Sequence, residues 1–257
     1  MALVCWRTDG AVTRLTLNRP ASLNALSEAL AAEFVAAVGR VAREKSKVVL
    51  LEGAGAAFCA GGDLVFIDKN RRRGASALAP LMRKFYGSFL SIRALPQVTI
   101  AKMQGCAVGA GLCLALSADL RVVADDARLG FNFVRLGLNP GMAAWPLARA
   151  ALGDARAREL LLTGRFFSGR DLFDWGAASG RGATPAELDA AAEELTRAVA
   201  AGSAESLRIL KEEMRLGGDL AAFLAHEARG QARMFKSPDI AEGVAAMRER
   251  RAPRFSL

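Results

Sequence analysis

The chain has 257 residues, 52% of them hydrophobic, which is enough to bury a full core without disulfides or metals. Its apolar stretches fall short of the roughly 20 residues that a membrane span requires, and the N-terminus lacks a signal-peptide pattern, so we expect a cytoplasmic protein with no membrane partner. The formal net charge of +9 is scattered along the chain. With one Tyr and three Trp for base stacking, this pattern argues against a nucleic-acid partner.

Cysteine and histidine usage gives no sign of a metal site. Each cysteine stands singly among apolar neighbours, without the paired spacing of metal ligands, and the chain has one histidine. We therefore expect reduced, buried thiols and predict neither a disulfide nor a bound metal. The residues concerned are Cys5, Cys59, Cys106, Cys113 and His226.

The first hundred residues alternate between strand and helix patterns. Period-two alternation and short apolar runs predict strands, and apolar residues at helical spacing predict helices. In chain order, the patterns predict a strand at 12–17, a helix at 28–44, a strand at 48–51, a helix at 75–94 and a strand at 97–102.

The stretch that follows contains three glycines spaced by small residues, Gly105, Gly109 and Gly111. Glycine lets the backbone approach a ligand closely and leaves its N–H groups unobstructed. The apolar run at 112–116 predicts a buried helix, whose N-terminus adds partial positive charge at the same place. The pattern is typical of an anion hole, although many such turns only pack a helix against a sheet.

A second glycine-rich segment strengthens the anion-hole interpretation. Gly61 and Gly62 come soon after the buried strand at 48–51, where α/β folds usually place their ligands. Two exposed backbone segments that each follow a strand can converge on one oxygen atom.

The rest of the chain is mostly helical. Periodicity and turn residues predict one further strand, one loop and five helices. These are the strand at 120–124, the loop at 137–141, and helices at 145–152, 155–162, 185–201, 203–216 and 220–235.

Short motifs spread over nearly the whole chain add a family resemblance. They are Asn18-Arg-Pro20, Leu23-Asn-Ala-Leu26, Phe58-Cys-Ala-Gly-Gly-Asp63, Gly105-Cys-Ala-Val-Gly-Ala-Gly111, Ala118-Asp119, Leu136-Gly-Leu-Asn-Pro-Gly141 and Asp239-Ile-Ala-Glu-Gly243. In order and spacing this set resembles the crotonase (enoyl-CoA hydratase/isomerase) superfamily. The resemblance implies an α/β fold, a ClpP-like spiral of repeated ββα units over residues 1–195. It also implies a helical region over 196–257 that builds a homotrimer or hexamer.

The resemblance also implies the chemistry. Backbone N–H groups of Gly62 and Ala110 would stabilise the enolate oxygen of an acyl thioester carried by coenzyme A or by an acyl carrier protein. Coenzyme A or phosphopantetheine would enter as part of the substrate, with no permanently bound cofactor, and either acidic partner suits a chain of net charge +9. The residues implied as contacts of coenzyme A are Leu23, Ala25, Ala60, Leu64 and Arg250.

The sequence departs from the family at the positions of the catalytic acid and base. The two glutamates of the hydratases fall on Cys113 and Phe133, and the aspartate of some isomerases falls on Gly141. Hydration needs both an acid and a base, so we expect a decarboxylase or a double-bond isomerase. In part the chain resembles the decarboxylating crotonase-like proteins of polyketide β-branching. Those proteins usually carry a histidine after the Gln-Gly of the central turn, where this chain has Cys106. The alternatives are a hydratase with substituted groups and a non-catalytic acyl-CoA binder.

Four side chains are candidates for the missing proton donor or for lining the pocket: Lys84, Tyr86, Asn132 and His226. Asn132 can orient a carboxylate or a water molecule but does not transfer protons usefully. A lone helical histidine is more often a surface residue, and a thiol at Cys113, buried among leucines, should be uncharged and inert.

Overall fold

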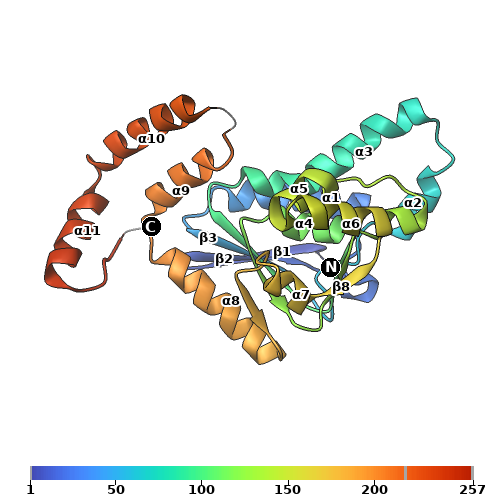
Figure 1. Cartoon of the computed structure of the whole chain (residues 1–257), viewed down its shortest axis with the longest axis horizontal. Helices are drawn as coiled ribbons and strands as arrows, with labels where there is room; N and C mark the ends of the chain where they lie inside the picture. Colours follow the sequence, from blue (N-terminus) through green and yellow to red (C-terminus); the bar gives the residue numbers. More distant parts are fainter. Residues whose placement is uncertain (1, 217–218, 256–257) are drawn as a thin grey trace.

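The computed structural model describes residues 2–216 and 219–255 and contains a six-stranded sheet in the order β1-β2-β3-β4-β6-β9 (Figure 1). β1 and β2 form an antiparallel hairpin, and every later neighbour in this sheet is parallel. The strands are β1 (Val4–Asp9), β2 (Val12–Leu17), β3 (Val48–Gly53), β4 (Val98–Met103), β6 (Leu120–Ala124) and β9 (Gly180–Gly182). The parallel strands are connected through helices, as parallel pairing requires.

A second, three-stranded sheet joins β5 (Cys106–Val108), β7 (Arg128–Gly130) and β8 (Phe166–Ser168). Because β5 follows β4 after two residues and β7 follows β6 after three, the chain repeatedly passes from one sheet to the other. The predicted α/β arrangement of repeated strand-strand-helix units is confirmed.

The helices of the described residues follow the predicted pattern closely, with the bounds given at the end of this paragraph. Ser27 caps the first of them by accepting a hydrogen bond from the Leu30 amide, as its position before the periodic run indicated. The helices are α1 (Glu28–Val41), α2 (Leu64–Asn70), α3 (Ala75–Leu90), α4 (Ala110–Leu116), α5 (Ala144–Leu152), α6 (Asp154–Thr163), α7 (Gly169–Asp174), α8 (Pro185–Ala200), α9 (Ala204–Glu213), α10 (Leu220–Met234) and α11 (Pro238–Glu249), with 3₁₀ turns at Pro20–Ser22, Ser91–Ala94 and Asn132–Leu136.

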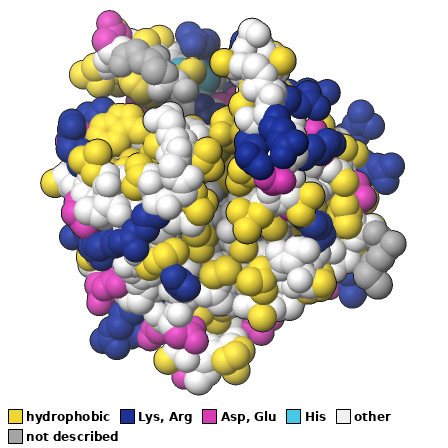
Figure 2. All heavy atoms as spheres, turned by 90° about the vertical axis from the view of Figure 1, so that its right-hand side faces the viewer, with side chains coloured by type: hydrophobic (Ala, Val, Ile, Leu, Met, Phe, Trp, Pro, Cys, Tyr) yellow, Lys and Arg dark blue, Asp and Glu magenta, His cyan; other side chains and the backbone are white. Residues whose placement is uncertain are grey.

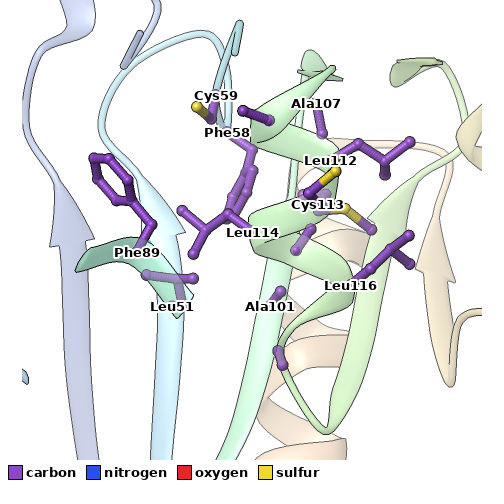
Figure 3. Packing of buried hydrophobic residues seen from close by; sticks show 14 of the residues in the cluster. Leu51, Phe58, Cys59, Phe89, Ala101, Ala107, Leu112, Cys113, Leu114 and Leu116 are labelled. Atoms are coloured by element: carbon purple, nitrogen blue, oxygen red, sulfur yellow. The ribbon is translucent and has the colours of Figure 1, made fainter. Parts of the chain in front are cut away.

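Helix α4 lies in the centre of the core, and all seven of its residues are buried. Leu114 points toward Phe58, whereas Cys113 points away from it (Figure 3). Phe34 of α1 and Phe89 of α3 are fully buried, with ring centroids 5.4 Å apart. A helix that is apolar all round must be enclosed on every side, so the N-terminus of α4 is held in a fixed place.

Three helices (α2, α7 and α11) and five short or exposed strands (β1, β5, β7, β8 and β9) were not among the elements predicted. Helix α2 begins at Asp63, whose carboxylate accepts a hydrogen bond from the Val65 amide, and α11 begins at Ser237, which accepts one from Asp239. Both helices are short or largely exposed and lack a clear apolar stripe, so periodicity did not reveal them. β1 is mostly exposed, and its pairing with β2 supplies the missing signal.

The C-terminal helices extend away from the core. The predicted domain boundary at residue 195 falls inside α8, which packs against β9, β6 and β4. Helix α9 contacts β4, whereas α10 buries no side chain, and α10 and α11 lie at the opposite end of the molecule from α2 (Figure 1). Among the residues described, no helix has the length and apolar character needed to cross a membrane.

Candidate active site

The two glycine segments singled out in the sequence lie side by side. The Cys59 amide donates to the Cys106 carbonyl at 3.0 Å, and the Val108 amide donates to the Cys59 carbonyl at 3.1 Å. These two hydrogen bonds hold the loop after β3 alongside β5. The segment with Gly61 and Gly62 and the segment with Gly109 and Gly111 therefore both lie at the N-terminus of α4. The predicted convergence of the two loops is therefore present.

Glycine is required where the loops touch. A Cβ built on Gly111 would lie 2.3 Å from the Cys59 carbonyl oxygen, and one built on Gly61 would lie 2.5 Å from the Val108 carbonyl oxygen. Gly61 also has φ of +98°, a conformation that other residues rarely adopt. Any side chain at these positions would force the two loops apart.

The backbone amides of Gly62 and Ala110 have no acceptor anywhere in residues 2–216 and 219–255. Ala110 is the first residue of α4, so its N–H points out of the helix end, where the dipole favours negative charge. The Cβ position of Gly61, next to Gly62, lies 3.8 Å from the Ala110 nitrogen. Two unpaired donors thus lie close together at a positive helix end, a geometry that suits an oxyanion.

A buried asparagine that sequence reasoning gave no role of its own shapes the neighbouring loop. Asn24 is fully buried with φ of +57°. Its side-chain amide donates to the carbonyls of Ala54 and Ala57 at 3.0 and 2.8 Å, and its oxygen accepts from the Arg19 amide at 2.8 Å. Asparagine tolerates the left-handed conformation better than most residues, and this was the signal available in the sequence.

An ion pair links the same loop to the glycine segment. The Arg19 guanidinium lies 3.0 Å from the Asp63 carboxylate and donates to the Ala25 carbonyl at 2.6 Å. Asp63 also caps α2, directly after Gly62. Arg19 and Asp63 therefore position the segment that carries the Gly62 amide.

Four of the residues implied as contacts of coenzyme A lie together beside this segment. The Ala60 amide donates to the Leu23 carbonyl at 2.9 Å, and Ala25 adjoins Leu26, which is bridged to Gly62. Leu64 is 69% exposed and Leu23 44% exposed, so both offer apolar surface to a ligand. The face that carries α2 shows hydrophobic side chains in a band between groups of Lys and Arg (Figure 2).

Arg250 is not part of this group within one chain. It is exposed and ends α11, which lies at the far side of the molecule from α2 (Figure 1).

The two positions that hold glutamates in hydratases are apolar here. Cys113 is fully buried, its thiol lies 3.8 Å from the Gly141 carbonyl oxygen as a weak donor, and burial raises the pKa of this thiol, which keeps it uncharged. Phe133 is 8% exposed, and its ring lies 3.7 Å from the Cβ position of Gly109. At neutral pH neither side chain can act as a base that takes a proton from water or as an acid that donates one to the substrate.

Two of the candidate substitutes reach the site. The Tyr86 hydroxyl oxygen lies 2.2 Å from the Cβ position of Gly141, and the Asn132 Oδ1 lies 3.1 Å from that of Gly109. Lys84 is exposed and stands two residues before Tyr86 on α3, so it faces another side of the helix. His226 of α10 is 4.0 Å from Glu213 of α9, away from the glycine segments.

In the part of the chain that the structure describes, no three His, Cys, Asp or Glu side chains gather as metal ligands would.

Comparison with known proteins gives a consistent result. The sequence model of the enoyl-CoA hydratase/isomerase family matches residues 7–256. A putative enoyl-CoA hydratase/isomerase of Bacillus subtilis, YhaR, is 32% identical over 99% of each chain, and the 1,2-epoxyphenylacetyl-CoA isomerase of Escherichia coli is 31% identical over 100% of this chain and 99% of its own. The structure of an enoyl-CoA hydratase from Bacillus anthracis superposes with a TM-score of 0.90 at 28% identity over 98% of each chain. This superposition confirms the predicted fold.

Proposed function

Because the chain belongs to the enoyl-CoA hydratase/isomerase family, we propose that it acts on an acyl-CoA thioester by stabilising an enolate between the amides of Gly62 and Ala110. The reaction we assign to it is decarboxylation. The observation that carries this assignment is the apolar character of both family acid and base positions, Cys113 and Phe133, in a site that keeps its two unpaired donors.

Decarboxylation fits this set of groups because the substrate supplies the electron pair itself. When the carbon–carbon bond to the carboxylate breaks, the pair enters the thioester as an enolate, and no base is needed to remove a proton. The protein has to hold the enolate oxygen and deliver one proton to carbon. Each well-placed backbone donor stabilises such a transition state by a few kcal/mol, about 3 kcal/mol in measured cases.

Double-bond isomerisation is the second candidate. It passes through the same enolate, and one relative, the Escherichia coli 1,2-epoxyphenylacetyl-CoA isomerase, is an isomerase of an acyl-CoA by name. Isomerisation also needs a base that removes a proton from the substrate. Neither Cys113 nor Phe133, at the positions of the family's acid and base, provides one. We therefore rank it below decarboxylation.

The experiment that tests the proposal compares three reactions on one preparation. With crotonyl-CoA we expect negligible hydration, followed as loss of the conjugated absorbance. With a panel of carboxylated acyl-CoAs, including malonyl-, methylmalonyl- and 3-methylglutaconyl-CoA, we expect release of carbon dioxide from at least one member. With a 3-enoyl-CoA we expect slower conversion than decarboxylation.

Hydration of crotonyl-CoA at tens of turnovers per second, an ordinary enzyme rate, would overturn the assignment in favour of a hydratase with substituted groups. Binding of the whole panel with no turnover would instead indicate a non-catalytic acyl-CoA binder.

The carrier and the assembly are part of the same proposal. Coenzyme A is the favoured carrier because Leu23, Ala25, Ala60 and Leu64 lie together beside Gly62. A carrier-protein substrate, as in the decarboxylating branch of polyketide β-branching, remains the alternative. We further propose a homotrimer, or a hexamer built from two trimers, in which Arg250 of one subunit reaches the nucleotide bound to another.

A further inference from the structure

Tyr86 of helix α3 is the side chain nearest to the place where the family's third acidic group is missing. Gly141 has no side chain, and the Tyr86 hydroxyl oxygen lies 2.2 Å from the position that a Cβ would take there. The phenol thus fills the space that a side chain at residue 141 would occupy. The Tyr86 ring also lies in an edge arrangement with the Phe85 ring, at a centroid distance of 6.1 Å.

The hydroxyl is also linked through Gly141 and Cys113 to helix α4, which carries one donor of the proposed oxyanion hole. Gly141 contacts Cys113 through its carbonyl oxygen, 3.8 Å from the thiol. Cys113 stands three residues after Ala110 on α4, so the two share a helix face, about one turn apart. A chain of direct contacts therefore runs from the Tyr86 hydroxyl to the helix turn that carries the Ala110 donor.

No atom in residues 2–216 or 219–255 forms a hydrogen bond with the Tyr86 hydroxyl, although the residue is half-buried. A half-buried phenol usually has a partner. Burial raises the pKa of this hydroxyl, and the Cys113 thiol raises it further, so the group stays protonated at neutral pH and keeps a proton to donate.

We propose that Tyr86 is the catalytic acid that protonates the enolate carbon. This assignment rests on the proposed function above. After carbon dioxide leaves, the enolate oxygen is held by the Gly62 and Ala110 amides. The Tyr86 O–H bond breaks as the new C–H bond forms, the thioester carbonyl is restored, and water returns a proton to the phenolate.

The chain offers a direct spectroscopic test because Tyr86 is its only tyrosine. Protein labelled with ¹³C at the tyrosine Cζ should give a single resonance. We expect this resonance to shift when acetoacetyl-CoA, whose enol form resembles the intermediate, is added to the full-length protein. Binding of acetoacetyl-CoA without any shift would overturn the role of Tyr86 and leave the thioester function standing. Absence of binding would refute the thioester function, and this role with it.

Variants separate catalysis from packing. Tyr86→Phe keeps the ring and should lower turnover of the fastest substrate in the acyl-CoA panel by roughly 10²-fold or more, with acetoacetyl-CoA binding preserved. Gly141→Ala would place a methyl group on the hydroxyl position, so it should displace the ring end, move the resonance of the free protein and lower turnover similarly.

Gly87→Ala is the matched control, because a Cβ there meets nothing within 4 Å although the residue adjoins Tyr86. It should change neither the resonance nor turnover. Parental turnover in a folded Tyr86→Phe variant would show that the tyrosine only fills space.

Discussion

At the scale of single residues, Asn24 shapes the loop beside the site. Its side chain makes three hydrogen bonds to backbone groups of residues 19, 54 and 57, and its φ is +57°, a conformation in which asparagine is enriched. Removing the side chain would leave one buried and one half-buried carbonyl, those of Ala57 and Ala54, without this donor, and alanine is poorly suited to the conformation.

We expect Asn24→Ala to lower the free energy of unfolding by about 3 kcal/mol, because three hydrogen bonds are lost, one buried and two part-buried, and because alanine disfavours the backbone conformation. Urea denaturation monitored by circular dichroism measures this change. Asn18→Ala is a suitable comparison, because the Asn18 side chain bonds to the Ala2 carbonyl at an exposed site, and it should cost less than about 1 kcal/mol. Equal losses in the two variants would contradict the role given to Asn24.

The sequence was informative about residues whose role depends on local spacing. The glycine patterns predicted two converging backbone segments, because an exposed N–H needs only a turn and a helix start, and the family resemblance placed the two donors at Gly62 and Ala110. The surroundings of Tyr86 did not follow, because Gly141 stands 55 residues later along the printed chain and only the fold brings the two together. Arg19 and Asp63 were missed for the same reason: their ion pair spans 44 residues.

At the scale of elements, α9 is fixed to the sheet by one buried cation. The Lys211 ammonium lies 2.6 Å from the Asp119 carboxylate and donates to the Gln97 carbonyl, while Asp119 also accepts from the Thr99 amide at 2.7 Å. Burial lowers the pKa of Lys211 even with Asp119 beside it. The ion pair therefore joins α9 to β4, although burying the Lys211 ammonium carries a desolvation penalty.

Lys211→Met should destabilise the protein by about 3 kcal/mol, because it leaves the Asp119 carboxylate without its cation. The control is Arg170→Met, which breaks an exposed pair with Asp174 and should cost less than about 1 kcal/mol. Thermal or urea unfolding compares the two variants. A loss for Lys211→Met as small as that of the control would show that α9 is held by apolar contacts alone.

Periodicity predicted the long helices α1, α3 and α8 because each buries an apolar stripe, α1 and α8 against the sheet and α3 against α1. It missed α2, α7 and α11, which are short or largely exposed and whose N-termini are capped by side chains. Helices without a buried stripe carry little signal in their apolar spacing.

At the scale of the whole molecule, the C-terminal helices carry apolar side chains that no residue in 2–216 or 219–255 covers fully. Leu220 is 73% exposed, Phe235 71% and Met247 83%, on or beside α10 and α11. A second copy of this chain is the occupant implied by the family resemblance. Light scattering should give a mass of three or six times 27.2 kDa, and a monomer at micromolar concentration would contradict the proposed assembly.

The same assembly predicts the effect of changing Arg250. Since α11 and α2 lie at opposite ends of one chain, the proposed assembly places Arg250 at a nucleotide bound to a neighbouring subunit. Arg250→Glu should weaken coenzyme A binding in a salt-sensitive manner, measured by calorimetry at two ionic strengths. Unchanged affinity would remove Arg250 from the binding site.

The central claim, that the Gly62 and Ala110 amides form an oxyanion hole, is tested most directly by titrating bound acetoacetyl-CoA through its enolate absorbance. Gly62→Pro removes one donor that has no internal acceptor among the residues described. Since such a donor stabilises an oxyanion by about 3 kcal/mol and one pKa unit is about 1.4 kcal/mol, we predict that the pKa of the bound ligand rises by about two units. Gly74→Pro, at an open position with φ of −63°, serves as the control, with melting temperature and oligomer size matched to the parent. A folded Gly62→Pro protein that binds acetoacetyl-CoA with an unchanged ligand pKa would contradict the account.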